Sequence, residues 1–217
     1  MRRQAGFTLV EIAIVLVIIG LLLGGVLKGQ ELIESAKVKN IGQDFRAISI
    51  AVLTYQDKYR ALPGDDPKAA SRWNGACVAS GGTSSALGNG LIEGSWSDVA
   101  ANGSGSEAAC AWDHLRRANL LTGDATSGAA PSNADGGRFG ITSDPTKAAV
   151  AGVGGTLIVC AGNIRGRHVI PLDAMLDDGD PATGAMRATL ANGTSPGTTA
   201  LANNIDDNQN YNVCMGF

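Results

Sequence analysis

An almost unbroken apolar run near the start of the chain constrains this protein more than any other feature. Positions 9–27 contain fifteen apolar residues, three glycines and one glutamate. An α-helix rises about 1.5 Å per residue, so about 20 apolar residues are needed to cross the hydrocarbon core of a bilayer. Residues 7–27 supply 21 positions. The sequence therefore predicts a membrane-spanning helix over residues 7–27.

The charges around this run predict its direction in the membrane. Arg2 and Arg3 precede it, and basic residues tend to stay on the cytoplasmic side. We therefore expect a single-pass protein with a cytoplasmic N-terminus and with the chain after Lys28 on the other side. An ordinary secretory signal has its small-residue cleavage site after the apolar core. Here the small pair Ala5-Gly6 lies before the run, so cleavage there would leave the anchor attached.

Glu11 is the one charged residue inside the apolar run. Burying a carboxylate in a spanning helix costs on the order of 2–3 kcal/mol even on lenient insertion scales. Two explanations fit the residues alone. Either Glu11, four positions after Phe7, lies close enough to the interface to remain hydrated, or a positively charged group pairs with it.

The residues from Gly6 to Glu11, followed by a long apolar helix, resemble the N-terminus of type IV prepilins and of the pseudopilins of type II secretion. In that family a membrane peptidase cuts after the glycine and methylates the new N-terminal residue. The resemblance implies a leader peptide over residues 1–6, cleavage between Gly6 and Phe7, N-methylation of Phe7, and a role for Glu11 in assembly. It covers roughly the first 35 residues.

The chemistry of the processed end gives a physical reason for the glutamate. Cleavage would place the ammonium group of Phe7 at the start of a helix, beside backbone N–H groups that have no partner within that helix. A carboxylate is a favourable neighbour for such a group. We expect Glu11 to pair with the Phe7 amine of its own chain or of an adjacent subunit, where the pairing would set the axial step of a filament.

Small residues recur along the same predicted helix. They give two small-xxx-small spacings, Gly20/Gly24 and Gly25/Gly29. Such spacings allow close approach of helices in lipid. Glycine is also simply frequent in membrane helices. A third explanation is that the pair Gly24-Gly25 is a soft point where the helix can stretch or melt in a filament, and the sequence does not separate the three.

Beyond Lys28 the chain is polar, but its apolar positions repeat at alternating steps of four and three. This pattern predicts an amphipathic helix with one buried face. We expect one helix over residues 7–60, ended by Leu62-Pro63-Gly64, with its second half packed against a head. The repeating positions are Ile41, Phe45, Ile48, Val52, Tyr55, Tyr59 and Leu62.

Residues 61–217 are predicted to form a globular, loop-rich head. They contain 24 of the 30 glycines, and 9 basic against 15 acidic side chains. This excess of acidic side chains argues against nucleic-acid binding. Two helices are expected, a short one opened by Asp66-Pro67 and ending at Arg72, and one over residues 107–121, capped by Ser106 and ended by Gly123. The strand candidates predict a small antiparallel sheet, so the predicted fold class is α+β. The strand candidates are residues 138–142, 155–160, 167–170, 186–189 and 211–215, and the long loops are 79–106, 122–137 and 192–204.

Four cysteines fit a head that is exported to an oxidising compartment. Four cysteines allow three complete pairings. Their order along the chain and the positions of the strand candidates favour Cys77–Cys110 and Cys160–Cys214.

The head offers little for catalysis or metal binding. Asp177, Asp178 and Asp180 crowd one turn and could hold calcium, although they lack the ligand order of an EF-hand. We favour a solvated acidic turn, and we expect no other cofactor.

Residues 193–197 match G-x-S-x-G, but an esterase needs the N–H after the serine, and Pro196 has none. We therefore predict that the protein is not an enzyme.

The resemblance implies a structural subunit of a type IV pilus or of a pilus-like filament. Its implied partners are the prepilin peptidase and methyltransferase, other pilin or pseudopilin subunits, and an inner-membrane assembly platform. Its implied location is the bacterial inner membrane, with the head in the periplasm and the filament in the periplasm or on the cell surface. Two alternatives remain: a minor pseudopilin of a type II secretion system, and a tip subunit that serves as an adhesin or in DNA uptake.

Overall fold

The computed structural model describes residues 8–79, 87–100, 103–125, 127–191 and 205–217. The chain divides into two compact units, residues 1–37 and residues 38–217.

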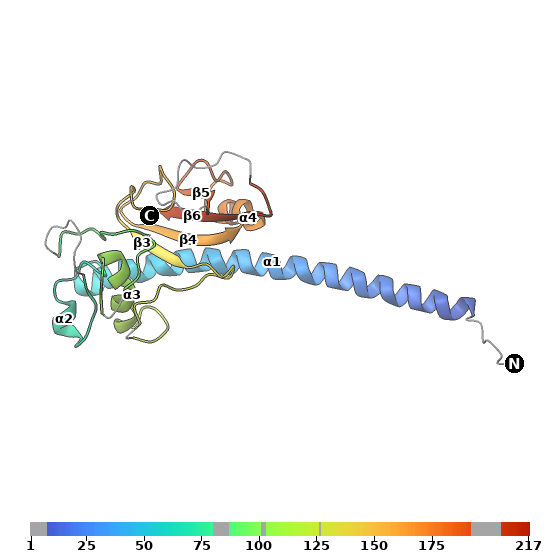
Figure 1. Ribbon diagram of the computed structural model, residues 1–217, viewed down its shortest axis with the longest axis horizontal. Helices are drawn as coiled ribbons and strands as arrows, with labels where there is room; N and C mark the ends of the chain where they lie inside the picture. Colours follow the sequence, from blue (N-terminus) through green and yellow to red (C-terminus); the bar gives the residue numbers. More distant parts are fainter. Residues whose placement is uncertain (1–7, 80–86, 101–102, 126, 192–204) are drawn as a thin grey trace. The chain divides into compact units, whose positions relative to one another are not determined.

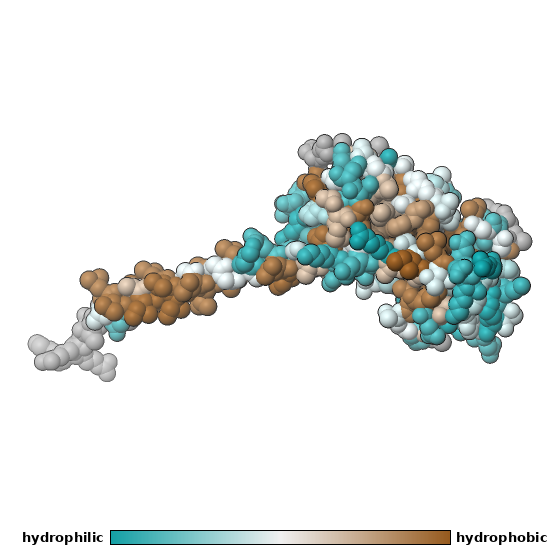
Figure 2. All heavy atoms as spheres, turned by 180° about the vertical axis from the view of Figure 1, so that it is seen from behind, coloured by the Kyte–Doolittle hydropathy of each residue, from teal (hydrophilic) through white to brown (hydrophobic). Residues whose placement is uncertain are grey.

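The described part of the first unit is the N-terminal portion of helix α1, which spans Leu9–Tyr59. The large apolar side chains between Leu9 and Leu27 are 46–90% exposed. Figure 2 shows them as a continuous apolar surface on this stretch of helix. Among the described residues, α1 is the one helix long and apolar enough to cross a membrane. These side chains therefore form an exposed apolar surface along this stretch of helix.

The second unit is built on a four-stranded antiparallel sheet in the order β3-β4-β6-β5. The long strands β4 and β6 lie at its centre, and Figure 1 shows them beside the C-terminal part of α1. This arrangement confirms the predicted α+β fold. The strands are β3 (Phe139–Thr142), β4 (Ile158–Arg165), β5 (Met186–Leu190) and β6 (Asn210–Gly216).

The buried face of α1 in this unit is the face that the periodic pattern predicts. Five of the seven repeating positions, from Ile41 to Tyr55, are at most 2% exposed, and Tyr59 and Leu62 pack against the same core at partial exposure. The ring of Phe45 meets that of Phe139 edge-on, with centroids 5.4 Å apart. The stripe therefore forms the main hydrophobic core together with the sheet and the helix over residues 107–117.

Helix α3 (Glu107–Arg117) begins where the sequence predicts but ends earlier. The side chain of Ser106 accepts the backbone N–H of Ala109, as an N-cap residue does. The predicted end at residue 121 is wrong. The chain leaves the helix because Asn119 adopts a φ of +57°, and asparagine is one of the residues that tolerate this left-handed conformation after a helix.

The predicted strand over residues 167–170 is also wrong, because this segment is the start of helix α4 (Gly166–Leu176). Its β-branched residues favoured a strand locally. The buried positions, however, are 166, 168, 169, 172 and 173, and the last four have the spacing of one helix face. The preceding strand β4 begins three residues after the predicted start and runs five residues beyond the predicted end.

Two further segments differ from prediction in detail. Helix α2 (Ala69–Arg72) is shorter than the segment predicted from Asp66. The long loop after Cys77 contributes two short strands, β1 (Val78–Ala79) and β2 (Ser104–Gly105), which pair in parallel. The predicted loop at 192–204 lies outside the described residues.

The turn after α1 needs its glycine. Gly64 has a φ of +91°, and a Cβ placed on it would lie 2.1 Å from the carbonyl oxygen of Glu107. A side chain there would be strained and would collide with the backbone of α3. Gly64 therefore lets the chain pass closely beside α3 as it leaves α1.

Candidate functional site

The described chain begins with two residues that hydrogen-bond each other across the first turn of α1. Glu11 Oε2 accepts the backbone N–H of Thr8 at 2.8 Å and the Thr8 hydroxyl at 2.8 Å. In return, Thr8 Oγ1 accepts the backbone N–H of Glu11 at 3.3 Å. The predicted cleavage residues Gly6 and Phe7 lie outside the described residues, one position before this motif.

This reciprocal pattern is a capping box, in which an N-cap hydroxyl and a glutamate three residues later satisfy each other's N–H groups. This capping role was not predicted from the sequence, where Glu11 stands out as a charge among apolar residues. The signal was present as Thr8-x-x-Glu11 before an apolar run. A carboxylate has several acceptor positions, so the cap leaves Glu11 able to accept an amine as well.

The described glycines of the first unit make no close packing contact with other described residues. A Cβ placed on any of them would meet no atom within 4 Å outside its own helix backbone. Their small size therefore leaves open notches along an exposed apolar helix. These residues are Gly20, Gly24, Gly25 and Gly29.

Exposed apolar residues also occur on α1 in the second unit. Ile50 and Leu53 are 61% and 57% exposed, whereas Val52 between them is fully buried. The two exposed residues are three positions apart and so lie on one side of the helix. This part of α1 thus has a buried apolar face and a second, exposed apolar strip.

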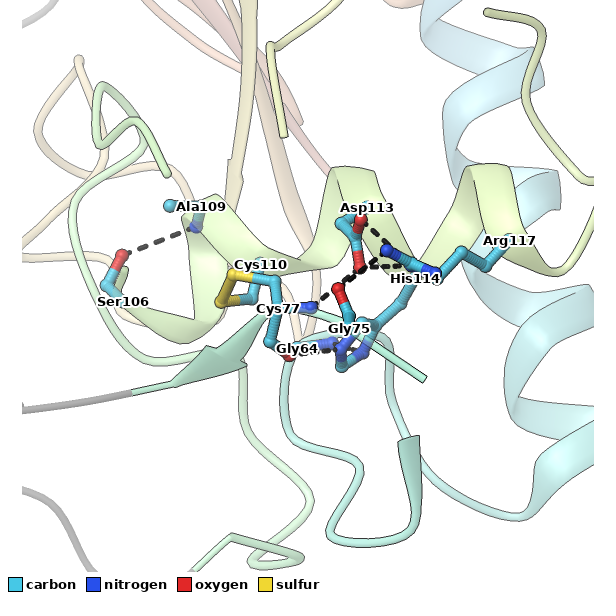
Figure 3. The surroundings of a disulfide bond; sticks show 9 residues. All are labelled: Gly64, Gly75, Cys77, Ser106, Ala109, Cys110, Asp113, His114 and Arg117. Carbon is cyan, nitrogen blue, oxygen red and sulfur yellow. Dashed lines mark hydrogen bonds and ion pairs between the residues drawn. A yellow bond between two sulfur atoms is a disulfide. The ribbon is translucent and has the colours of Figure 1, made fainter. Parts of the chain in front are cut away.

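The structure contains two disulfides, in the pairing that the order along the chain favours. Cys160–Cys214 joins β4 and β6 at a position where the two residues are register partners. Cys77–Cys110 joins the chain just before β1 to the second turn of α3 (Figure 3).

Charged and polar side chains of α3 hold the backbone beside the Cys77–Cys110 disulfide (Figure 3). Asp113 Oδ2 accepts the backbone N–H of Cys77 at 2.8 Å and also receives Arg117 Nε at 2.8 Å. Arg117 Nη2 in turn donates to the carbonyl oxygen of Gly75 at 2.7 Å. The disulfide is therefore one of several links between this segment and α3.

His114 completes this set of links as a neutral side chain. Its Nδ1 accepts the backbone N–H of Gly64 at 2.9 Å, so its Nε2 carries the proton that it donates to the carbonyl oxygen of Cys77 at 2.8 Å. Burial lowers the pKa of His114, which agrees with this neutral form. Both ring nitrogens are occupied by backbone groups, so His114 joins two segments of chain.

Glu107 is a buried carboxyl group at the start of α3. It is 4% exposed, and its Oε2 accepts the backbone N–H of Glu93 at 2.8 Å. Burial raises the pKa of Glu107 to about 7, with smaller contributions from the charges of Asp65 and Glu93, while the hydrogen bond from the Glu93 N–H acts in the opposite direction. The protonation of Glu107 therefore changes near neutral pH.

The acidic turn differs from its sequence prediction in one member. Asp177 and Asp178 lie close to Asp173, a buried residue of α4 that was not predicted as part of the site. Asp180 is not part of this group, and its Oδ1 accepts the backbone N–H of Ala182 at 3.0 Å. Burial and the three neighbouring aspartates raise the pKa of Asp173 to about 6.

The comparisons with known proteins bear on the N-terminal segment. A family model for the prokaryotic N-terminal methylation motif matches residues 1–27. A search of curated proteins and a search of solved structures each found no match. The family match confirms the resemblance that was drawn from the residues between Gly6 and Glu11. The chain thus carries, at its N-terminus, the methylation motif that is the hallmark of type IV prepilins and pseudopilins.

Proposed function

We propose that this protein is a structural subunit of a type IV pilus or of a pilus-like filament, stored in the bacterial inner membrane before assembly. The observation that carries the proposal is the match to the methylation motif over residues 1–27, on a helix whose apolar residues are exposed. The motif indicates a structural subunit rather than an enzyme. Its head, residues 61–217 in the predicted division, would lie in the periplasm.

Processing would prepare the end of the helix for assembly. A prepilin peptidase would hydrolyse the bond between Gly6 and Phe7, and a methyl group would be added to the new amine. That amine would precede Thr8 directly, at the end of a helix where the dipole favours negative charge. Glu11 already lies at this end, bonded to Thr8. It can therefore accept the amine of its own chain or that of a neighbouring subunit.

Assembly would exchange one apolar environment for another. In the membrane the exposed side chains of α1 contact lipid, and in a filament they would contact the helices of other subunits. The open notches at the glycines allow such helices to approach closely. Apolar packing alone does not fix the axial offset between subunits. An ion pair made by Glu11 would fix it.

Mass spectrometry of the protein isolated from its native host tests the processing step. We expect a mature chain of 211 residues that begins at Phe7 and carries one added methyl group. In a host strain that lacks the prepilin peptidase, the chain should keep Met1. An intact N-terminus in the peptidase-positive host, or cleavage at another bond, would overturn the proposal.

Labelling of filaments separates the pilus from the secretion pseudopilus. Antibodies against the head should decorate surface pili along their length if the protein is a main pilus subunit. Short filaments confined to the cell envelope would assign it to a type II secretion system. Label at filament ends alone would assign it to a tip position.

A further inference from the structure

Three aspartates come together where α4 ends, and one of them is buried with a carboxylate oxygen that has no hydrogen-bond partner. Asp173, Asp177 and Asp178 each contribute an oxygen, and these oxygens lie within 4.8 Å of one another. Asp173 is 0% exposed, and its Oδ2 lacks a partner among the described residues. Its other oxygen, Oδ1, accepts the backbone N–H of Gly179 at 3.3 Å.

A buried carboxylate oxygen without a partner is unfavourable, because it has lost its hydrogen bonds to water without replacement. The neighbours of Asp173 make this worse, since Asp177, Asp178 and Asp180 add negative charge around it. Two arginines approach the same segment, but they donate to carbonyl oxygens. Arg46 Nη2 bonds Met175 at 3.1 Å, and Arg187 Nε bonds Gly184 at 3.4 Å. The described contacts therefore leave the charge of this cluster without a cation.

The two exposed aspartates are held in place by the loop that follows α4. Asp177 Oδ2 accepts the backbone N–H groups of Ala185 at 2.6 Å and Met186 at 3.0 Å. Asp178 Oδ2 accepts the hydroxyl of Thr183 at 2.8 Å. Each carboxylate keeps further acceptor positions, so these bonds orient the oxygens without using up their capacity for a ligand.

Gly184 allows the loop to close around these oxygens. Its φ is +68°, and a Cβ there would lie 1.9 Å from Asp177 Oδ2 and 3.1 Å from Asp178 Oδ2. Any side chain at this position would therefore disturb both carboxylates. The backbone of Gly184 thus lies close to the carboxylates of Asp177 and Asp178.

We propose that Asp173, Asp177 and Asp178 bind a divalent cation, with calcium as the ion that fits best. The donors are all carboxylate oxygens, which hard cations prefer. Two oxygens that share a calcium ion lie at most about 5 Å apart, since each bond is about 2.3–2.6 Å long. The separations in the cluster fall within this limit. Water would complete the coordination, and Asp173 Oδ2 would gain the partner that it lacks.

The ion would connect two elements of the head. Asp173 belongs to α4, whereas Asp177 and Asp178 belong to the loop that leads to β5. Binding would therefore stabilise this loop against the end of the helix, at one edge of the sheet. A ligand that binds only the folded state raises the thermal stability in proportion to the logarithm of its concentration.

Thermal unfolding and calorimetric titration of the full-length protein in detergent test the proposal. With calcium at about one hundred times its Kd, we expect the Tm to rise by about 5–10 °C above the value in EDTA. Magnesium at the same concentration should raise it less, because it requires a tighter octahedral shell. No calcium heat and no calcium-dependent rise in Tm would overturn the proposal.

Three substitutions sharpen the test. Asp173→Asn keeps the shape of the side chain and removes its charge, so it should abolish the calcium response while leaving the Tm in EDTA equal to or above that of the unaltered protein. Asp178→Asn, at an exposed position, should weaken calcium binding at least tenfold without a folding defect. Asp207→Asn is the matched control at an exposed aspartate outside the cluster, and its calcium response should be unchanged. A full calcium response in both Asp173→Asn and Asp178→Asn would exclude this site.

Discussion

Glu11 Oε2 receives both the backbone N–H and the hydroxyl of Thr8 at 2.8 Å, so the one carboxylate in the apolar run is a helix cap in the full-length chain. This pairing gives the carboxylate of Glu11 hydrogen-bond partners within its own chain. After cleavage the residue preceding Thr8 would carry a free amine. The same carboxylate can then change from a cap within one chain to a contact between chains, and substitutions separate the two roles.

Replacement of Glu11 should distinguish its charge from its hydrogen bonds. Glu11→Gln keeps an acceptor for Thr8 but cannot form an ion pair with an amine. Loss of one partner from a dehydrated ion pair costs about 3–5 kcal/mol, so we expect filament incorporation to fall by about tenfold or more. Cleavage after Gly6 should be unaffected. Immunoblots of sheared filaments measure incorporation, and mass spectrometry of the cell fraction measures cleavage.

Two companion variants complete this experiment. Thr8→Ala removes the capping hydroxyl and keeps the charge of Glu11, so assembly should persist. Glu31→Gln is the control on the same helix, because Glu31 forms an exposed ion pair with Lys28. Normal assembly of the Glu11→Gln subunit would show that the charge is not needed.

Removal of the Cys77–Cys110 disulfide should destabilise the head without unfolding it. The bond closes a sequence separation of 33 residues, and the loss of that constraint on the unfolded chain is expected to lower the free energy of unfolding by about 3–4 kcal/mol. Asp113 and His114 still hold the backbone of Cys77, so the folded conformation should remain. Urea unfolding of the double alanine variant, with near-ultraviolet circular dichroism as the check on packing, measures both effects. An unchanged midpoint would contradict the prediction.

The stability of the head should fall as the pH rises through neutrality. Burial raises the pKa of Glu107 to about 7, whereas the ordinary pKa of a free glutamate is 4.5. Between these values the folded state holds a proton that the unfolded state has lost, so the contribution of Glu107 declines with increasing pH and is lost above about pH 7. The full difference is about 3 kcal/mol.

The variant Glu107→Gln isolates this effect, because an amide oxygen can still accept the Glu93 N–H. Urea unfolding between pH 4.5 and pH 8 should show wild type losing stability relative to the variant across that window. Other groups titrate over the same range, so the quantity that matters is the difference between the two proteins. A difference that stays constant with pH would show that Glu107 does not titrate there.

The sequence was sufficient to predict the elements that carry a strong local signal. The stripe from Ile41 to Tyr55 lies in a helix and is buried, because a spacing of three and four residues places side chains on one face. The start of α3 was also predictable, since Ser106 is a strong N-cap residue. Both signals are local, and the local preference agrees with the packing.

The remaining elements depend on contacts that are distant in sequence. The residues around Val169 have strand propensity, yet they form α4 because their apolar side chains pack into the core at helical spacing. Asp173 was missed for a similar reason. In the sequence Asp173 lies four residues before Asp177, outside the acidic turn. Because these residues are helical, they span about one turn and place Asp173 beside Asp177.

Substitution of the exposed apolar strip of α1 should impair assembly and spare folding. Ile50 and Leu53 are 61% and 57% exposed, so the double change to glutamine should alter the free energy of unfolding by less than about 0.5 kcal/mol. If subunits pack through this strip, incorporation into filaments should fall severalfold in the blots of sheared filaments. Lys58→Gln, at an exposed polar position on another side of the same helix, should leave incorporation unchanged. Wild-type incorporation of the double variant would exclude this strip from the contacts between subunits and limit assembly to the N-terminal part of α1.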